Sequence, residues 1–302
     1  MTISKVAIIG LGLLGGSIGL AVKQHAPDIA TTGYDRDSDV RNTASERNLV
    51  DTVCSSAADA VREADLVILC VPMGAMGDAA AAIADAVQPD AIISDVGSSK
   101  QGVAGTLAKA LPDHTIIPAH PVAGTEQSGP EAGFASLFTN RWCILTPPSD
   151  ADEGAVDALA DFWRKLGARI EIMDAEHHDL VLAVTSHIPH LIAFTIVGTA
   201  SDLEDVTRSE VIKYSAGGFR DFTRIAASDP VMWRDVFLSN KAAVLEMLGR
   251  FTEDLTALQR AIRSGDGDKL HELFSRTRAI RRSIIEEGQD DERPDFGRED
   301  HT

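Results

Sequence analysis

The first 174 residues alternate short apolar segments with helical stretches. Seven segments rich in valine and isoleucine recur along this part of the chain: VAIIG, IATTGYD, ADLVILCVP, AIISDV, HTIIPAH, RWCILTP and ARIEIMD. Alanine-rich stretches with a helical pattern, such as residues 77–87, separate them. Apolar strands that alternate with helices are typical of a parallel sheet covered on both faces. The pattern predicts a doubly wound α/β domain over residues 1–174.

After residue 174 the pattern is helical. We expect one long apolar helix over residues 177–200, shorter pieces over 202–219, a long helix over 230–264 and a further helix over 269–287, after a glycine-containing break. In the 230–264 helix, six apolar residues recur at spacings of four and three, as in a coiled coil: Val244, Leu248, Phe251, Leu255, Leu258 and Ile262. Residues 175–287 are therefore predicted to form a helical domain. The acidic stretch 288–302 has few apolar residues and is predicted to be a disordered tail.

The charge and the cysteines narrow the class of protein. The formal net charge is −18 and the isoelectric point is near 4.8, which argues against nucleic acid or an anionic membrane as a partner. Three cysteines without CxxC spacing suit reduced thiols in a cytosol. No signal peptide precedes the first strand, and we expect no apolar stretch long enough to cross a bilayer. The sequence predicts a cytoplasmic protein.

A glycine-rich loop follows the first predicted strand. Gly10-Leu11-Gly12-Leu13-Leu14-Gly15 opens a helix, and such spacing allows a tight turn, close approach of a pyrophosphate and close helix packing. The free N–H groups of the helix would bind phosphates. Asp35 ends the second strand, where an acid accepts hydrogen bonds from an adenosine ribose and repels a 2′-phosphate. Arg36 beside it can accommodate that phosphate. The sequence therefore favours NAD, but NADP stays an alternative.

Three loops are expected at the carboxyl ends of the predicted strands, where doubly wound sheets bind their ligands. They are Cys70-Val71-Pro72, 95–100 (DVGSSK) and Ala119-His120-Pro121. A dehydrogenase that oxidises an alcohol needs a base for the hydroxyl proton, and histidine titrates near neutral pH. His120 is the candidate base, and Ser98 is a candidate to bind the same hydroxyl or to orient the ring. A loop histidine is more often structural, but this position favours catalysis.

The helical region adds further polar candidates. His187 and His190 have a spacing that can suggest a metal, but Pro189 between them distorts a helix and no nearby ligand completes the set, so no metal is predicted. His190 is the better candidate for substrate contact, whereas His187 can equally be a packing group. Gly217-Gly218 and the arginines that follow suit capture of a carboxylate. Of these, Arg224 precedes an apolar segment and is expected to face inward, whereas Arg220 suits a surface turn.

Together these motifs resemble one known family. GLGLLGGS, DVGSSK, AHPVAGTEQSG, TSHIPH, GGFRDFTRIAASDP and MWRDVFLSNK, in this order, are similar to the prephenate/arogenate dehydrogenases of tyrosine biosynthesis, and to the cyclohexadienyl dehydrogenases in particular. The resemblance covers residues 5–287. It implies oxidative decarboxylation of prephenate to 4-hydroxyphenylpyruvate, or of arogenate to tyrosine, with NAD as cofactor. The chain begins at the dinucleotide motif and ends soon after the last helix, so we expect neither a fused mutase domain nor a C-terminal amino-acid-binding domain.

The resemblance also assigns roles to individual residues. It places the catalytic histidine at His120, the assisting serine at Ser98, a substrate-contacting histidine at His190 and the carboxylate-binding arginine at Arg224. Around them it implies substrate- and cofactor-binding positions: Thr125, Glu126, Gln127, His187, Gly217, Asp221 and Trp233 for prephenate or arogenate, and Gly10, Gly12, Leu13, Leu14, Gly15, Asp35, Arg36, Val71, Pro72 and Ser98 for NAD. Gln127 lies where a side chain can tune prephenate against arogenate. The family also implies an intertwined homodimer through the helical region, with Trp233 reaching towards the partner's active site.

Two other classes are compatible with a dinucleotide domain followed by helices. β-Hydroxyacid and imine-reducing dehydrogenases use a lysine with an asparagine four residues later on the first long helix of the second domain. Here the only comparable pair is Asn240-Lys241, in the opposite order and far down the chain. A non-catalytic NAD-sensing protein would tolerate the loss of His120, Ser98 and Arg224, yet all three are present.

Overall fold

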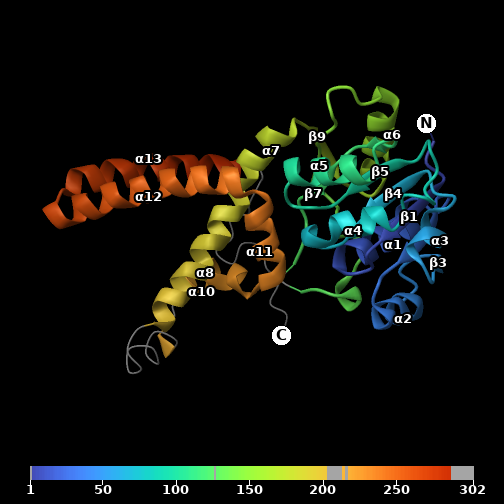
Figure 1. The fold of residues 1–302 in the computed structure, drawn as a ribbon. Coiled ribbons are helices and arrows are strands. Elements are labelled where there is room, and N and C mark those ends of the chain that lie inside the picture. Colours follow the sequence, from blue (N-terminus) through green and yellow to red (C-terminus); the bar gives the residue numbers. More distant parts are fainter. Residues whose placement is uncertain (1, 126, 203–212, 215–216, 287–302) are drawn as a thin grey trace. The chain divides into compact units, whose positions relative to one another are not determined.

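The computed structural model describes residues 2–125, 127–202, 213–214 and 217–286, and each of its two compact units is considered separately (Figure 1). The first unit spans Met1–Leu245 and contains both sheets and the helices up to the start of the long helix α12. The second unit spans Glu246–Thr302 and contains the rest of α12 and the helix α13. The expected tail, 288–302, lies outside the described residues, as does most of 202–219.

The first sheet is parallel and has six strands in the order β3-β2-β1-β4-β5-β6. The strands are β1 (Lys5–Ile9), β2 (Ala30–Tyr34), β3 (Thr52–Val53), β4 (Leu66–Leu69), β5 (Ile92–Asp95) and β6 (Thr115–Ile116). The helices between and after them are α1 (Leu13–His25), α2 (Ser38–Glu46), α3 (Ala57–Val61), α4 (Met76–Ala81), α5 (Gln101–Ala110) and α6 (Glu153–Lys165). This architecture confirms the predicted doubly wound α/β fold, although the expected helix 77–87 ends early, at Ala81.

Alternate residues of the central strand β1 pack into two different hydrophobic cores, one on each face of the sheet. Val6 and Ile8 pack in a cluster with Ile18 of α1 and Trp163 of α6. Ala7 and Ile9 belong to a second cluster on the other face, with buried residues of α3, α4 and α5. Because side chains alternate along a strand, a run that is apolar at every position requires helices on both faces.

The apolar segment HTIIPAH contributes to two sheets instead of one. Its first part forms β6, and after Pro118 the strand β7 (Ala119–Pro121) pairs antiparallel with β8 (Trp142–Leu145). The strand β9 (Arg169–Ile172) completes a three-stranded sheet by parallel pairing with β8. The prediction that all seven segments share one parallel sheet is therefore wrong. Pro118 lacks an N–H group and cannot donate to a ladder, so the segment changes sheets there.

The helices of the first unit after residue 174 differ from the predicted ones. They are α7 (Ala175–Leu182), a π-helical turn (Ala183–His187), α8 (Ile188–Ser201), α10 (Gly217–Thr223), a 3₁₀ turn (Arg224–Ala227) and α11 (Pro230–Ser239). The predicted single helix 177–200 is present as one continuous helical segment, Ala175–Ser201, and contains a π turn, a feature that is frequent at functional sites. The predicted helix 230–264 is two helices, α11 and α12 (Lys241–Ser264), because Asn240 between them leaves helical geometry.

In the second unit, α12 continues to Ser264 and α13 covers Gly267–Glu286. Gly265 adopts a φ of 68°, a left-handed conformation that favours glycine and ends α12, as the break predicted. Part of the predicted apolar seam is not covered by other residues of the chain: Leu255 is 48% exposed and Ile262 is 67% exposed. Phe274 and Ile280 on α13 are exposed too.

The expectation that no segment is long enough to cross a bilayer is wrong by length and composition. The continuous helical segment Ala175–Ser201 has 27 residues and an 18-residue window of mean hydropathy 1.9, of which 28% is buried. This segment contains Asp179 and the two histidines of the TSHIPH motif. The core helix of a soluble protein meets the same criteria.

Two glycines at the start of α1, the N-cap Gly12 and Gly15 in the helix itself, make a matched stability test. A Cβ at Gly15 would overlap the main-chain oxygen of Gly10, whereas a Cβ at Gly12 would have no atom within 4 Å. Gly15→Ala should lower the free energy of unfolding by about 1–3 kcal/mol through overpacking. Gly12→Ala should cost less than about 1 kcal/mol, the scale of a helix N-cap change. Chemical denaturation of both variants measures this difference, and equal losses would contradict the packing described here.

Candidate active site

The loop between β1 and α1 has the shape that a dinucleotide phosphate requires. Gly10 has a φ of 101°, and a Cβ there would overlap the main chain of Cys70. The N-cap residue Gly12 makes no side-chain cap, so the first N–H groups of α1 are not satisfied by a cap side chain. The open space around Gly12 leaves room for a phosphate beside these groups. Leu13 and Leu14 form the first turn of this helix. The residues present therefore fit a bound dinucleotide.

Asp35 stands at the end of β2 beside this loop. One of its carboxylate oxygens accepts a hydrogen bond from the Leu11 N–H (2.9 Å) and the other accepts from the Asp37 N–H (3.0 Å). Arg36 is exposed, but Arg41 of α2 donates to the carbonyls of Asp35 (2.7 Å) and Arg36 (3.1 Å). The corner where a ribose would lie thus contains a fixed carboxylate and a second cation, Arg41, which the motif did not reveal.

The loops after β4 and β5 lie close to α11. Val71 is half-buried and Pro72 is exposed at the start of a 3₁₀ turn (Met73–Ala75) that contacts α11. After β5, Ser98 is half-buried, and its neighbour Ser99 shares a hydrogen bond with Ser239 at the end of α11 (2.7 Å). The helical region therefore packs directly on the loops that the sequence assigned to the cofactor.

A buried ion pair joins the end of β5 to the strand that carries the candidate base. Lys100 Nζ lies 2.5 Å from Asp95 Oδ2, and both side chains are fully buried. Lys100 also donates to the Ala119 carbonyl (2.6 Å), and the Ala119 N–H donates to Asp95 Oδ1 (3.3 Å). Burial lowers the pKa of Lys100, and the charge of Asp95 opposes that shift. His120, the next residue after Ala119, is held in place by this pair.

His120 is 8% exposed and has a specific partner. Its Nδ1 lies 2.9 Å from Nε2 of His178, and Nδ1 of His178 lies 2.9 Å from Oδ1 of Asp179. Burial is the main cause that lowers the pKa of His120 well below 6.5, and His178, Lys100 and His187 lower it further. Burial also lowers the pKa of His178, although the hydrogen bond that His178 donates to Asp179 opposes this shift. Near neutral pH the His120 ring is therefore neutral, and one of its two nitrogens can accept a proton.

Asn240, at the junction of α11 and α12, fixes the orientation of His187. Its Nδ2 donates to the main-chain oxygen of Asp179 (2.7 Å) and lies 3.1 Å from Nδ1 of His187. Since Nδ1 then accepts, the proton of neutral His187 belongs on Nε2. Burial lowers the pKa of His187 to about 4. The main chain of Ser98 lies near enough to raise that pKa slightly, although Nε2 reaches hydrogen-bond geometry with no group in the described part of the chain.

His190 stacks on Trp233, with ring centroids 3.6 Å apart and an interplanar angle of 23°. Its Nδ1 lies 2.9 Å from the Ser186 carbonyl, and burial lowers its pKa. Trp233 is only 6% exposed and also contacts His187 and Phe237. Its own chain therefore buries most of the Trp233 ring, and the approach of Trp233 to a partner's active site stays a prediction.

The remaining substrate candidates are exposed. Thr125 accepts a hydrogen bond from the Gln127 N–H (3.2 Å) in the loop after β7, and Glu126 lies outside the described residues. Gly217 and Asp221 are exposed on α10. Arg224 opens the 3₁₀ turn packed against α8 and is exposed, so the expectation that it faces inward is wrong.

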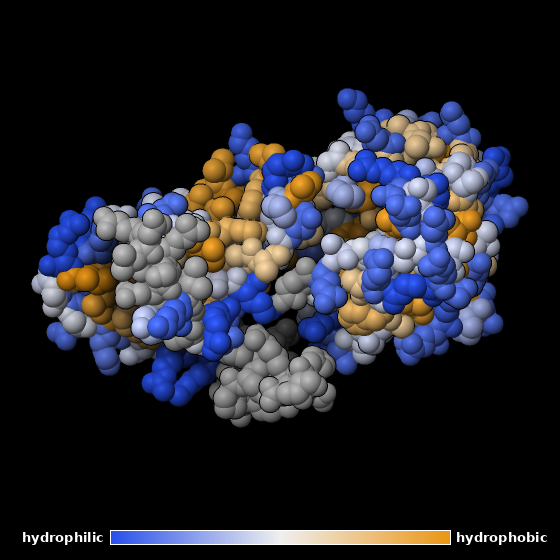
Figure 2. All heavy atoms as spheres, turned by 90° about the horizontal axis from the view of Figure 1, so that it is seen from below, coloured by the Kyte–Doolittle hydropathy of each residue, from blue (hydrophilic) through white to orange (hydrophobic). Residues whose placement is uncertain are grey.

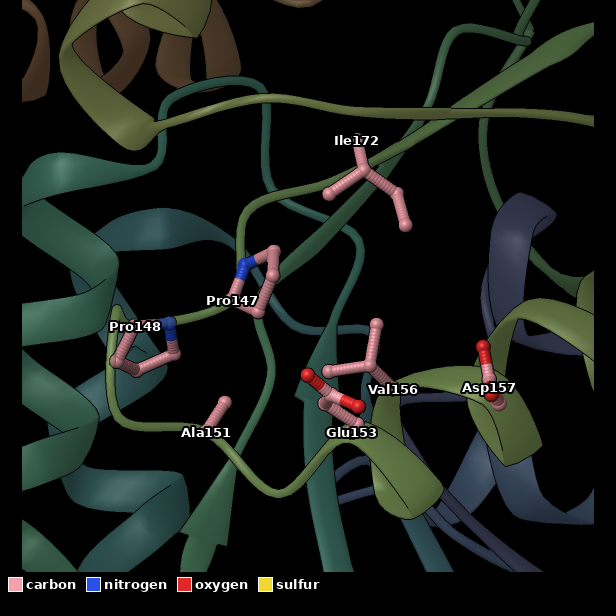
Figure 3. A pocket seen from close by; sticks show the side chains of 7 residues that line it. All are labelled: Pro147, Pro148, Ala151, Glu153, Val156, Asp157 and Ile172. Atoms are coloured by element: carbon pink, nitrogen blue, oxygen red, sulfur yellow. The ribbon is translucent and has the colours of Figure 1, made fainter.

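Two further features of the described part of the chain are its lack of a metal-binding cluster and a separate surface hollow. Among the described residues, no group of three or more histidine, cysteine, aspartate or glutamate side chains is placed to hold a metal ion. A shallow hollow of about 300 Å³ lies beside the start of α6, and it shares no residue with the cluster around His120 (Figure 3). It is lined by Pro147, Pro148, Ala151, Glu153, Val156, Asp157 and Ile172.

Comparisons with known proteins agree with the motifs. The family model for the nucleotide-binding domain of prephenate dehydrogenase matches residues 18–172, and the model for the dimerization domain of prephenate dehydrogenase matches residues 174–276. The chain is 49% identical over 285 residues to cyclohexadienyl dehydrogenase from Zymomonas mobilis, covering 94% of this chain and 97% of that protein.

Two solved structures share the whole architecture. The prephenate dehydrogenase from A. aeolicus, crystallised with hydroxyphenyl propionate and NAD⁺, is 31% identical with a TM-score of 0.87, and the match covers 94% of this chain and 99% of that one. The arogenate dehydrogenase from Synechocystis is 25% identical with a TM-score of 0.79, over 93% of this chain and 99% of that one. The resemblance seen in the sequence is confirmed, and the chain belongs to the prephenate dehydrogenase family.

Proposed function

We propose that the protein catalyses NAD-dependent oxidative decarboxylation of prephenate to 4-hydroxyphenylpyruvate, of arogenate to tyrosine, or of both, in tyrosine biosynthesis. The observation that carries the proposal is the buried His120 on β7, which is hydrogen-bonded to His178 and follows the residue that the Lys100–Asp95 pair joins to the end of β5. The close likeness to a cyclohexadienyl dehydrogenase and the likeness to prephenate and arogenate dehydrogenase structures support the same reaction.

In the mechanism, His120 accepts the proton of the ring hydroxyl. The histidine is neutral near pH 7 because burial lowers its pKa, so it is ready to act as a general base. The glycine loop and Asp35 would hold NAD⁺, which when bound would accept the hydride from the carbon that bears the hydroxyl. The ring carboxylate leaves as carbon dioxide, and its bonding electrons complete the aromatic ring. Ser98, on the loop after β5, assists by binding the same hydroxyl.

The substrate carboxylates need a cationic anchor, and Arg224 is the candidate. A guanidinium binds a carboxylate in a bidentate pair that lysine imitates poorly. Its exposed position is compatible with contact to a ligand. His187, His190, Gly217, Asp221, Trp233 and the loop with Thr125, Glu126 and Gln127 complete the proposed substrate-binding set. Arg224→Lys should raise the KM for prephenate, because it removes an interaction that is already made in the ground state.

An assay of NADH formation tests the function. The purified protein with NAD⁺ should form NADH with prephenate, arogenate or both, and not with simple β-hydroxy acids. His120→Asn should lower kcat by about two to four orders of magnitude, the usual contribution of general acid–base catalysis. Since the lowered pKa of His120 keeps it neutral, its protonation should not reduce kcat between pH 8 and 6.5.

The control is NAD⁺ binding by His120→Asn, which should remain near that of the unmodified protein because His120 is not in the glycine loop. A folded, NAD⁺-binding protein that oxidises neither prephenate nor arogenate would contradict the proposed function. A kcat of His120→Asn within a few-fold of normal would place the base elsewhere.

We further propose that the protein is a cytoplasmic homodimer and that its helices after residue 174 form the subunit interface. Apolar side chains are exposed over this region: Val184, Ile196 and Val197 in the first unit, and Leu255, Ile262, Phe274 and Ile280 in the second. Apolar (orange) surface gathers over the helical part of the chain in Figure 2. Twofold pairing is the commonest way to bury such surface. The apolar segment Ala175–Ser201 is then an interface helix, and the division into domains at residue 174 follows the same proposal.

A charged residue in the exposed seam should dissociate the dimer. Leu255→Glu places a carboxylate in an apolar interface, which is costly without a partner, and light scattering at micromolar protein should show a monomer. Arg260→Gln is the control, because it makes the same change in net charge five residues away, near the opposite side of α12. A monomeric mass for the unmodified protein would contradict the proposal.

A further inference from the structure

We propose that His178 and Asp179 are positioning residues that hold His120 in the tautomer whose Nε2 carries the reactive lone pair. This inference rests on the proposed function, in which His120 is the base. Neither residue belongs to the sites that the sequence motifs assign, and both come from α7, 58 and 59 residues after the base. The three side chains form one continuous line of hydrogen bonds from a carboxylate to the catalytic ring.

The hydrogen-bond partners determine where each proton lies. The carboxylate of Asp179 only accepts, so Nδ1 of His178 must carry a proton. Burial lowers the pKa of His178, and its neutral ring has only one N–H group, so its Nε2 accepts. Nδ1 of His120 must then donate to that nitrogen. This arrangement leaves Nε2 of His120 unprotonated and free to take the hydroxyl proton.

Asp179 is itself held in place from three directions. Its carboxylate accepts the N–H groups of Lys100 (2.7 Å) and Gln101 (3.0 Å) at the start of α5. Its main-chain oxygen accepts from Asn240 (2.7 Å). These contacts fix the carboxylate that orients His178. The two ring centroids lie 5.1 Å apart and the bonded nitrogens 2.9 Å apart, which agrees with a hydrogen bond along the line between the rings.

The same line of groups stays connected during the reaction. When Nε2 of His120 takes the substrate proton, Nδ1 remains bonded to His178, and the negative charge of Asp179 lies at the far end. The other titratable groups near His120 are Lys100, paired with Asp95, and His187. Burial, His178, Lys100 and His187 all disfavour a charge on His120, whereas Asp179 favours a charge on His178.

Two substitutions at His178 separate positioning from packing. His178→Phe keeps a ring of similar size but offers no acceptor to His120, whereas His178→Gln offers a carbonyl oxygen. We expect kcat of His178→Phe to fall at least tenfold, and His178→Gln to restore a substantial part of it. The KM for prephenate and the Kd for NAD⁺ should stay within about threefold in both, because the change affects the base and not the ligand contacts.

Thermal midpoints establish that each variant is folded. If His178→Phe does not fold, Asp179→Asn is the second test: its amide removes the negative charge, and kcat should again fall at least tenfold with KM retained. Folded His178→Phe with kcat within twofold of normal, or equal losses in folded His178→Phe and His178→Gln, would overturn the positioning role. Either result would leave the proposed function intact, because that function is tested by the unmodified protein and His120→Asn.

Discussion

The geometry of the site depends on the buried ion pair between Lys100 and Asp95. Both side chains are fully buried, and each also bonds to the main chain of Ala119. A buried charge is tolerated only when it is paired and its remaining hydrogen-bonding positions are satisfied. Because Asp95 ends β5 and Ala119 begins β7, the pair joins the two sheets directly before His120. Removal of either partner alone leaves a buried charge, which typically costs about 3–5 kcal/mol.

The helices after residue 174 provide the side chains that orient the histidine carried by β7. Asp179 of α7 satisfies the first N–H groups of α5, while His178 bonds to the base. Asn240 connects the same aspartate to His187. The cofactor-binding part of the chain supplies the histidine, but the helical part supplies the groups that orient it. This arrangement explains why His178 and Asp179 of α7, and Asn240 directly after α11, are buried although they are polar.

Much of the fold was predictable because its signals are local. Continuous apolar strands, the glycine loop and Asp35 are recognised from spacing alone, and His120 from its place between prolines after a strand. The passage of HTIIPAH between two sheets was not foreseen, although Pro118 was a visible signal. The break at Asn240 depends on a side chain that bonds across 53 and 61 residues of sequence, which periodicity does not report.

The site shows the same limit. His178 and Asp179 were visible as polar residues near the start of a helix, but only the packing of α7 on α5 brings them to His120. Trp233 was assigned to a partner because large aromatic residues often anchor interfaces, yet its stacking on His190 buries it within its own chain. Arg224 was expected to face inward from the apolar residues that follow it, and those residues do not determine the direction of its side chain.

The central claim is that a buried network presents one unprotonated nitrogen of His120 to the substrate. Nitrogen-15 NMR of the histidine rings at pH 7, with His120→Asn to assign its signals, measures this property in the unmodified protein. The account predicts a neutral His120 ring with its proton on Nδ1 and an unprotonated Nε2. A ring protonated on Nε2, or on both nitrogens, would contradict it.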